Sequence, residues 1–138
     1  MATIATAIPN RRAEIPRVAR VVDDLAAAQG LPGDVVADMQ VALDEVLTNI
    51  ISYGYADEGV HVIQVRVTAD ERSLTAEIED DGRPFNPLDA PEPDLRGGVR
   101  DRAVGGLGIR FVRTLMDHVE YSRAADRNHL VLTRRTAR

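Results

Sequence analysis

Residues 34–53, with the sequence DVVADMQVALDEVLTNIISY, form the stretch that decides the fold. Apolar residues recur there every three or four positions, which predicts an amphipathic helix from Asp34 to Tyr53, with Asp34 as its N-cap. The apolar stripe consists of Val36, Met39, Leu43, Val46, Leu47 and Ile50. Glu45 and Asn49 are one helical turn apart, so they share a face beside this stripe. A carboxylate and a carboxamide so placed suit a general base and an oxygen ligand for Mg²⁺, although the same pair also occurs on solvated helix faces.

The composition is that of one ordinary domain. The chain has 138 residues, of which 44% are hydrophobic and 28% charged, so it can bury a core. The net charge of −5 argues against general affinity for nucleic acid, and the absence of cysteine excludes thiolate metal sites. No apolar run reaches the roughly 20 residues of a membrane span, and the N-terminus does not resemble a signal peptide. We expect a single cytoplasmic domain over residues 1–138, without direct contact to nucleic acid or membrane.

The rest of the chain alternates between helical and strand-like patterns. The predicted elements are a strand over 2–8, a helix over 11–29, the central helix, strands over 60–69 and 73–80, a helix after Gly108, and strands over 119–122 and 129–133. Helices and hairpins are partly segregated along the chain. The sequence therefore predicts an α+β two-layer sandwich, with three helices packed on one face of a mixed, mostly antiparallel sheet.

Two further motifs flank a long loop over residues 86–104 that has no periodicity. Asp80-x-Gly82 ends a predicted strand; the carboxylate can accept a hydrogen bond from an exocyclic amine, and the glycine lets a flat ring approach the backbone. Gly105-Gly106-x-Gly108 opens a predicted helix, where free backbone N–H groups and the helix dipole favour an anion. The glycine spacing fits neither a Walker loop nor a dinucleotide fingerprint. Taken alone, each motif also fits a plain turn or loop.

In combination, these motifs resemble the Bergerat-type ATP-binding fold shared by gyrase, Hsp90, histidine kinases and MutL. Within that fold, the chain resembles the small bacterial anti-sigma factor serine/threonine kinases. ALDEVLTNIISYGY (42–55) is similar to their N-box helix, EDDGRPFNP (79–87) to their D-x-G-x-P-F turn, and GGLGIRFVRTLMDHVEYSR (105–123) to their last glycine box with its helix and following strand. The resemblance covers nearly the whole chain.

The resemblance implies a role for each motif residue. Asn49 is expected to coordinate the Mg²⁺ that bridges the ATP phosphates, and Glu45 to act as the general base toward a serine or threonine hydroxyl. Asp80 is expected to bind the adenine amine, and Gly82 to let the ring dock. The loop over 86–104 is expected to be the ATP lid. The residues expected to bind the phosphates are Gly105, Gly106, Leu107 and Gly108.

Several positions depart from the family pattern. Tyr53 stands where the family often has histidine, and Val104 where some members have arginine before the glycine box. Arg100 and Arg102 lie nearby, and either could approach the γ-phosphate. The wider superfamily often offers a threonine from its final strand pair to the adenine site, but the matching residues here are Arg127-Asn128-His129. That contact is therefore open.

The implied function is an ATP- and Mg²⁺-dependent protein serine/threonine kinase of the partner-switching type. It would bind a sigma factor or another output protein and phosphorylate an anti-anti-sigma (STAS-type) antagonist, and it would be a homodimer. Arg20 on the first helix is the best match to a partner-contacting arginine of some members. Two alternatives stay open at this point: a nucleotide-responsive binding module or activator without kinase activity, and an α+β interaction domain whose motifs are coincidental.

Overall fold

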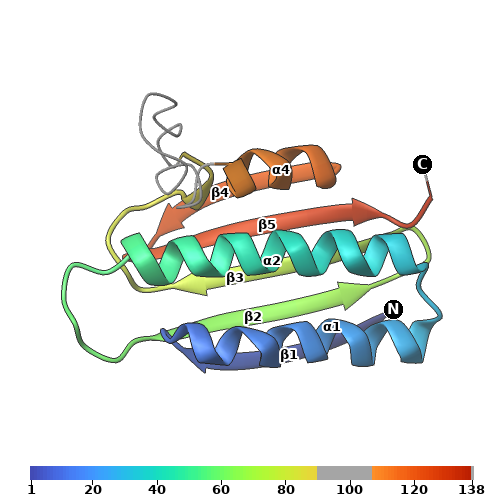
Figure 1. Ribbon diagram of the computed structural model, residues 1–138, viewed down its shortest axis with the longest axis horizontal. Helices are drawn as coiled ribbons and strands as arrows, with labels where there is room; N and C mark the ends of the chain where they lie inside the picture. Colours follow the sequence, from blue (N-terminus) through green and yellow to red (C-terminus); the bar gives the residue numbers. More distant parts are fainter. Residues whose placement is uncertain (90–106, 138) are drawn as a thin grey trace.

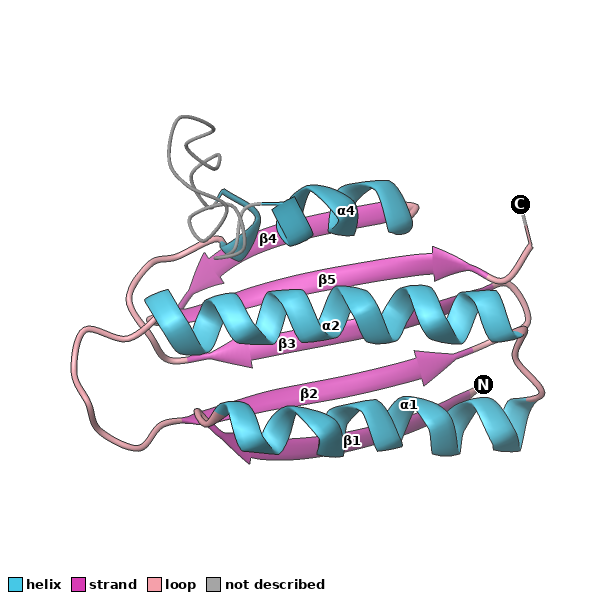
Figure 2. Ribbon diagram, viewed as in Figure 1, coloured by secondary structure: helices cyan, strands magenta, loops and turns pink. Residues whose placement is uncertain are grey.

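The computed structural model describes residues 1–89 and 107–137, which form a five-stranded sheet covered by helices (Figure 1). The strands lie in the order β1-β2-β3-β5-β4, and the described helices lie over the same face of the sheet, with α2 between α1 and α4 (Figure 2). The elements are β1 (Ala2–Pro9), the 3-10 turn η1 (Arg12–Glu14), α1 (Ile15–Gln29), α2 (Gly33–Tyr53), β2 (Val62–Ala69), β3 (Ser73–Asp80), the 3-10 turn η2 (Pro87–Asp89), α4 (Leu107–Leu115), β4 (His118–Ala124) and β5 (Arg127–Arg135). No helix in the described ranges is long and apolar enough to cross a membrane.

The α+β two-layer sandwich predicted from the sequence is confirmed, with one correction to the sheet. Every strand pair of the described residues is antiparallel, so the prediction of a mixed sheet is wrong. β1 and β2 are joined by two helices, α1 and α2, and each helix traverses the length of the sheet once. The chain therefore re-enters the sheet running opposite to β1. β3 and β4 run in the same direction, but β5 lies between them.

Residues along β2, β3 and β5 alternate between buried and more exposed positions, because successive side chains point to opposite faces of the sheet. The buried residues lie on the face that α1, α2 and α4 cover. The helix-facing row of β3 is Leu74, Ala76, Ile78 and Asp80, and that of β5 is Asn128, Leu130, Leu132 and Arg134. The β3 row is apolar except for Asp80 at its end. The β5 row is apolar in its middle and has a polar residue at each end, Asn128 and Arg134. Asp80 pairs directly with Asn128 across the two strands, so both polar groups are buried at one end of the sheet.

The polar residue at the other end, Arg134, ties β5 to the start of α2. Its side chain is only 4% exposed. Its Nε donates to Asp38 at 2.9 Å, while Nη2 lies 3.3 Å from Asp34. The prediction that Asp34 caps α2 is wrong: the N-cap residue is Pro32, without a side-chain cap hydrogen bond. The Asp34 carboxylate lies against a cation from the last strand instead.

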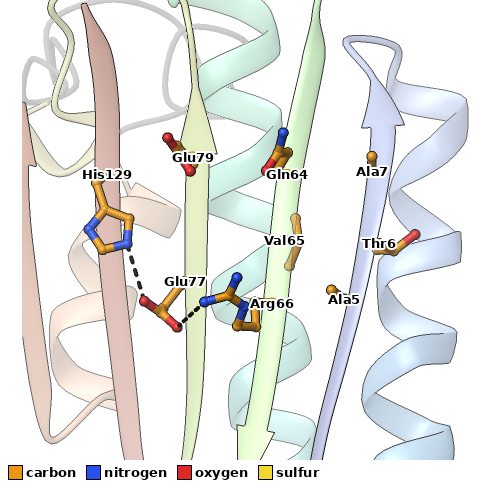
Figure 3. Close-up of a pocket in the computed structure, with 9 residues that line it drawn as sticks. All are labelled: Ala5, Thr6, Ala7, Gln64, Val65, Arg66, Glu77, Glu79 and His129. Atoms are coloured by element: carbon orange, nitrogen blue, oxygen red, sulfur yellow. Dashed lines mark hydrogen bonds and ion pairs between the residues drawn. The ribbon is translucent and has the colours of Figure 1, made fainter. Parts of the chain in front are cut away.

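The described helices lie over one face of the sheet (Figure 1), and the opposite face carries polar side chains from β2, β3 and β5 (Figure 3). Glu77 on β3 lies between two cationic or titratable side chains, 3.3 Å from His129 on β5 and 3.8 Å from Arg66 on β2. Glu79 pairs with Arg127 at 2.6 Å beside them. These contacts satisfy the charges across neighbouring strands, as in sheets that face water on one side.

Candidate functional site

The predicted site residues that the structure describes gather around one end of the molecule. There α2, β3 and β4 end, while α4 and β5 begin (Figure 1). Glu45 and Asn49 lie in the second half of α2, and Asp80 ends β3. Leu107 and Gly108 are the first two residues of α4. Several predicted positions lie outside the described residues: Gly105, Gly106, Arg100, Arg102, Val104 and most of the lid.

Asn49 is buried, with 2% exposure, and its amide nitrogen has no hydrogen-bond partner among the described residues. A buried polar group without a partner costs about 1–3 kcal/mol, and most such groups are paired in native proteins. The amide offers an oxygen suited to Mg²⁺ and an NH₂ group suited to a phosphate oxygen. The unpaired position therefore fits a residue whose partner belongs to a ligand.

Glu45 lies one turn before Asn49 on α2 and is partly buried. Burial raises the pKa of its carboxyl above the ordinary value, and the neighbouring Asp44 carboxylate raises it further. A carboxylate with a raised pKa is a stronger base once it is ionised, which suits proton abstraction from a hydroxyl.

The Asp80–Gly82 turn packs directly on the end of α2. Oδ1 of Asp80 accepts a hydrogen bond of 2.9 Å from the Gly82 backbone N–H. The Arg83 backbone N–H donates to the Gly54 carbonyl at 2.9 Å, and Arg83 Nε donates to the Tyr53 carbonyl at 2.8 Å. A Cβ at Gly82 would lie 2.3 Å from the Gly54 carbonyl oxygen, so only glycine fits this approach.

Asn128 is the residue of this site whose role the sequence left open. It is 3% exposed and donates to Oδ1 of Asp80 at 3.0 Å. The sequence feature that could have placed Asn128 is the alternation of apolar and polar residues along the last strand. Extending that strand two residues upstream of its predicted start at His129 puts Asn128 in the buried row, opposite Asp80. Tyr121 and Arg123 of β4, which both bond to Asn128, were not predicted.

Tyr55, which follows Gly54 in the chain, lies close to the Asp80–Gly82 turn. The ring of Tyr55 stacks on His61 with centroids 4.4 Å apart, and His61 contacts Asp57 at 2.8 Å and Asp81 at 3.3 Å. The Tyr55 hydroxyl is buried without a hydrogen-bond partner in the described part of the chain. Burial raises the pKa of Tyr55 strongly, and the Asp80 and Asp81 carboxylates raise it further, so the phenol stays protonated.

With this geometry in place, comparison with known proteins identifies the family. Residues 8–134 match the family described as "Histidine kinase-like ATPase domain". The chain belongs to this family, whose members are built around an ATP-binding domain.

Curated relatives narrow the class. The chain is 30% identical over 99 residues to the serine/threonine-protein kinase BtrW of Bordetella bronchiseptica, covering 72% of this chain and 70% of the relative. It is 26% identical over 127 residues to the serine-protein kinase RsbW of Halalkalibacterium halodurans, covering 86% of this chain and 74% of that protein. It is 28% identical over 91 residues to the anti-sigma F factor of Clostridium novyi, covering 61% of this chain and 59% of that protein. These similarities confirm the anti-sigma kinase group that the motifs resemble.

A solved structure supports the fold. The crystal structure of the RsbU and RsbW domains of a Mycobacterium tuberculosis protein superposes with a TM-score of 0.64 at 16% sequence identity. The match covers 98% of this chain and 32% of that one, so the chain spans about a third of the solved protein. At this identity, the likeness extends to the fold.

Proposed function

We propose that this chain is an ATP- and Mg²⁺-dependent protein serine/threonine kinase of the anti-sigma, partner-switching type, acting as one domain over residues 1–138. Its family and the kinase names of its relatives support the activity. The observation that carries the proposal is on α2. There Glu45, with its raised pKa, lies one turn from the buried Asn49, whose amide nitrogen has no hydrogen-bond partner among the described residues. Phosphoryl transfer depends on positioning and charge neutralisation more than on covalent chemistry, so a base and a ligand group at this spacing suit it.

Each residue then has a distinct task. ATP with Mg²⁺ would supply the transferable phosphoryl group. Asn49 would hold the metal through its amide oxygen, Asp80 would accept from the base amine, and Gly82 would leave room for the ring. Glu45 would take the proton of a serine or threonine hydroxyl on the protein substrate. The residues that would receive the phosphates are Gly105, Gly106, Leu107 and Gly108.

We infer the partners from the anti-sigma, partner-switching class of kinases. The substrate would be an anti-anti-sigma antagonist with a STAS domain, and the second partner a sigma factor or another output protein. Arg20 lies exposed on α1, which is consistent with a partner contact. We propose a homodimer located in the cytoplasm, which light scattering on the purified chain and cell fractionation would test.

The test of the kinase proposal is phosphoryl transfer by the chain and its Glu45→Gln variant. The substrates are the STAS-domain proteins of the same organism, and phosphoserine and phosphothreonine are measured by mass spectrometry. We expect transfer by the wild type and a loss of about 10²–10⁴-fold in Glu45→Gln, with ATP affinity unchanged. Asp44→Asn is the matched control, since it removes an adjacent exposed carboxylate from the same helix.

Two results would count against the proposal. If ATP binds and no STAS protein is phosphorylated, the chain is a binding module without kinase activity. If Glu45→Gln transfers phosphate at the wild-type rate, another group is the base.

A further inference from the structure

Asn128 has every hydrogen-bonding position of its side chain occupied by protein. Its Nδ2 group donates to Oδ1 of Asp80 at 3.0 Å and to the Arg83 carbonyl at 2.8 Å. Its Oδ1 accepts from the Phe85 backbone N–H at 3.3 Å, from Arg123 Nη1 at 3.0 Å and from the Tyr121 hydroxyl. An amide has two N–H donors and one carbonyl acceptor, so no capacity remains for a ligand.

These partners also fix which way the amide points. In the flipped orientation, the NH₂ group would face the Phe85 N–H and the Arg123 guanidinium, and the carbonyl would face Asp80. The observed orientation is therefore the one the network supports. Arg123 also donates to the Gly82 carbonyl at 3.1 Å, so β4 holds both Asn128 and the turn.

This hydrogen-bond network makes the two carboxylate oxygens of Asp80 different. Oδ1 already accepts from Gly82 N–H at 2.9 Å and from Asn128. Oδ2 receives no hydrogen bond from residues 1–89 or 107–137. An ionised carboxylate only accepts, so this free oxygen matches a ligand atom that donates and repels one that carries a lone pair.

We propose that Asn128 is the positioning residue that sets the base preference of the site. By occupying Oδ1 and fixing the carboxylate plane, it leaves Oδ2 as the acceptor for the exocyclic amine of a 6-aminopurine. A 6-oxopurine presents an oxygen at that position and is rejected. This inference rests on the proposed function, because it requires a nucleotide at Asp80. It assigns Asn128 no contact with the base itself.

The test compares two nucleotides that differ at the purine 6-position. Calorimetric titration of ATP and of inosine triphosphate, both with Mg²⁺, gives the affinity ratio for the wild type, Asn128→Ala and Asn128→Thr. We expect the wild type to prefer ATP by about 10–100-fold, as for a hydrogen bond to a charged group. The ratio should fall about tenfold or more in Asn128→Ala. Asn128→Thr retains one hydroxyl donor for Asp80 and should recover part of the preference.

A merely structural role predicts a different result, in which both affinities fall by the same factor and the ratio stays constant. Asn10→Ala is the matched control, because Asn10 bonds the backbone of Gly59 and His61 and does not contact Asp80. If Asn128→Ala does not fold, Tyr121→Phe removes one donor to the Asn128 carbonyl and should lower the ratio in the same direction.

The outcomes separate this inference from the proposed function. A folded wild type that binds neither nucleotide refutes the proposed function. If the wild type prefers ATP and the ATP-to-inosine-triphosphate affinity ratio is unchanged in Asn128→Ala, the role of Asn128 is overturned while the proposed function stands. If Asn128→Ala does not fold, an unchanged ratio in both Asn128→Thr and Tyr121→Phe has the same meaning.

Discussion

Gly82 is the position where the smallest side-chain change should disturb the site most. An alanine Cβ there would lie 2.3 Å from the Gly54 carbonyl oxygen and 2.9 Å from Oδ1 of Asp80. The Gly54 oxygen is backbone at the end of α2, so no side-chain rotation relieves the overlap. Carbon–oxygen contacts need roughly 3.3 Å, so the turn must move by about 1 Å. That movement breaks its hydrogen bonds to α2 and displaces Asp80.

The expected size of the effect follows from this overlap. Overpacking of this kind costs about 1–3 kcal/mol, which for a domain of this length lowers Tm by roughly 3–9 °C. The displaced turn should also weaken ATP binding by about tenfold or more. Gly33→Ala is the matched control, because nothing lies within 4 Å of a Cβ at that position. It should be neutral or stabilise by up to about 1 kcal/mol.

Thermal unfolding followed by circular dichroism, together with calorimetric titration of ATP and Mg²⁺, measures both effects on the two variants. If Gly82→Ala matches Gly33→Ala in Tm and ATP affinity, the close approach of the turn to α2 is not a requirement of the site.

Two further predictions concern the start of α2 and the pH dependence of catalysis. Asp38→Ala should lower the free energy of unfolding in urea by about 3–5 kcal/mol, because it leaves the buried Arg134 guanidinium without its main partner. Asp34→Ala should cost no more than about 1 kcal/mol, because Asp34 is 74% exposed; equal costs would contradict this ranking. The base must be ionised, so kcat should rise with pH through the raised pKa of Glu45 and then stay level. Asp44→Asn removes a charge that raises this pKa and should move the rise to lower pH, whereas an unmoved rise would assign it to another group.

The sequence predicted the elements that local periodicity determines. The central helix was predicted within one residue of its observed start, and β3 was predicted with its observed bounds, because apolar spacing and alternation are local properties. The DxG turn was found for the same reason, since its residues are adjacent in the chain.

The errors concern contacts between distant segments. Asp34 was predicted as a cap from its neighbours, but its carboxylate lies against Arg134, 100 residues further along. Asn128 is 48 residues from Asp80, and only the pairing of β3 with β5 brings them together. A single sequence does not specify that register. The mixed sheet was wrong because the directions of β1 and β2 depend on how the intervening helices pack.

The most direct test of the account is calorimetric titration of ATP into nucleotide-free protein, with and without Mg²⁺, repeated on Asp80→Asn. We predict Mg²⁺-dependent binding to the wild type and a loss of at least about tenfold in the variant, with an unchanged Tm. Absence of binding to the folded wild type, or equal binding by the variant, would contradict the nucleotide site described for this end of the sheet.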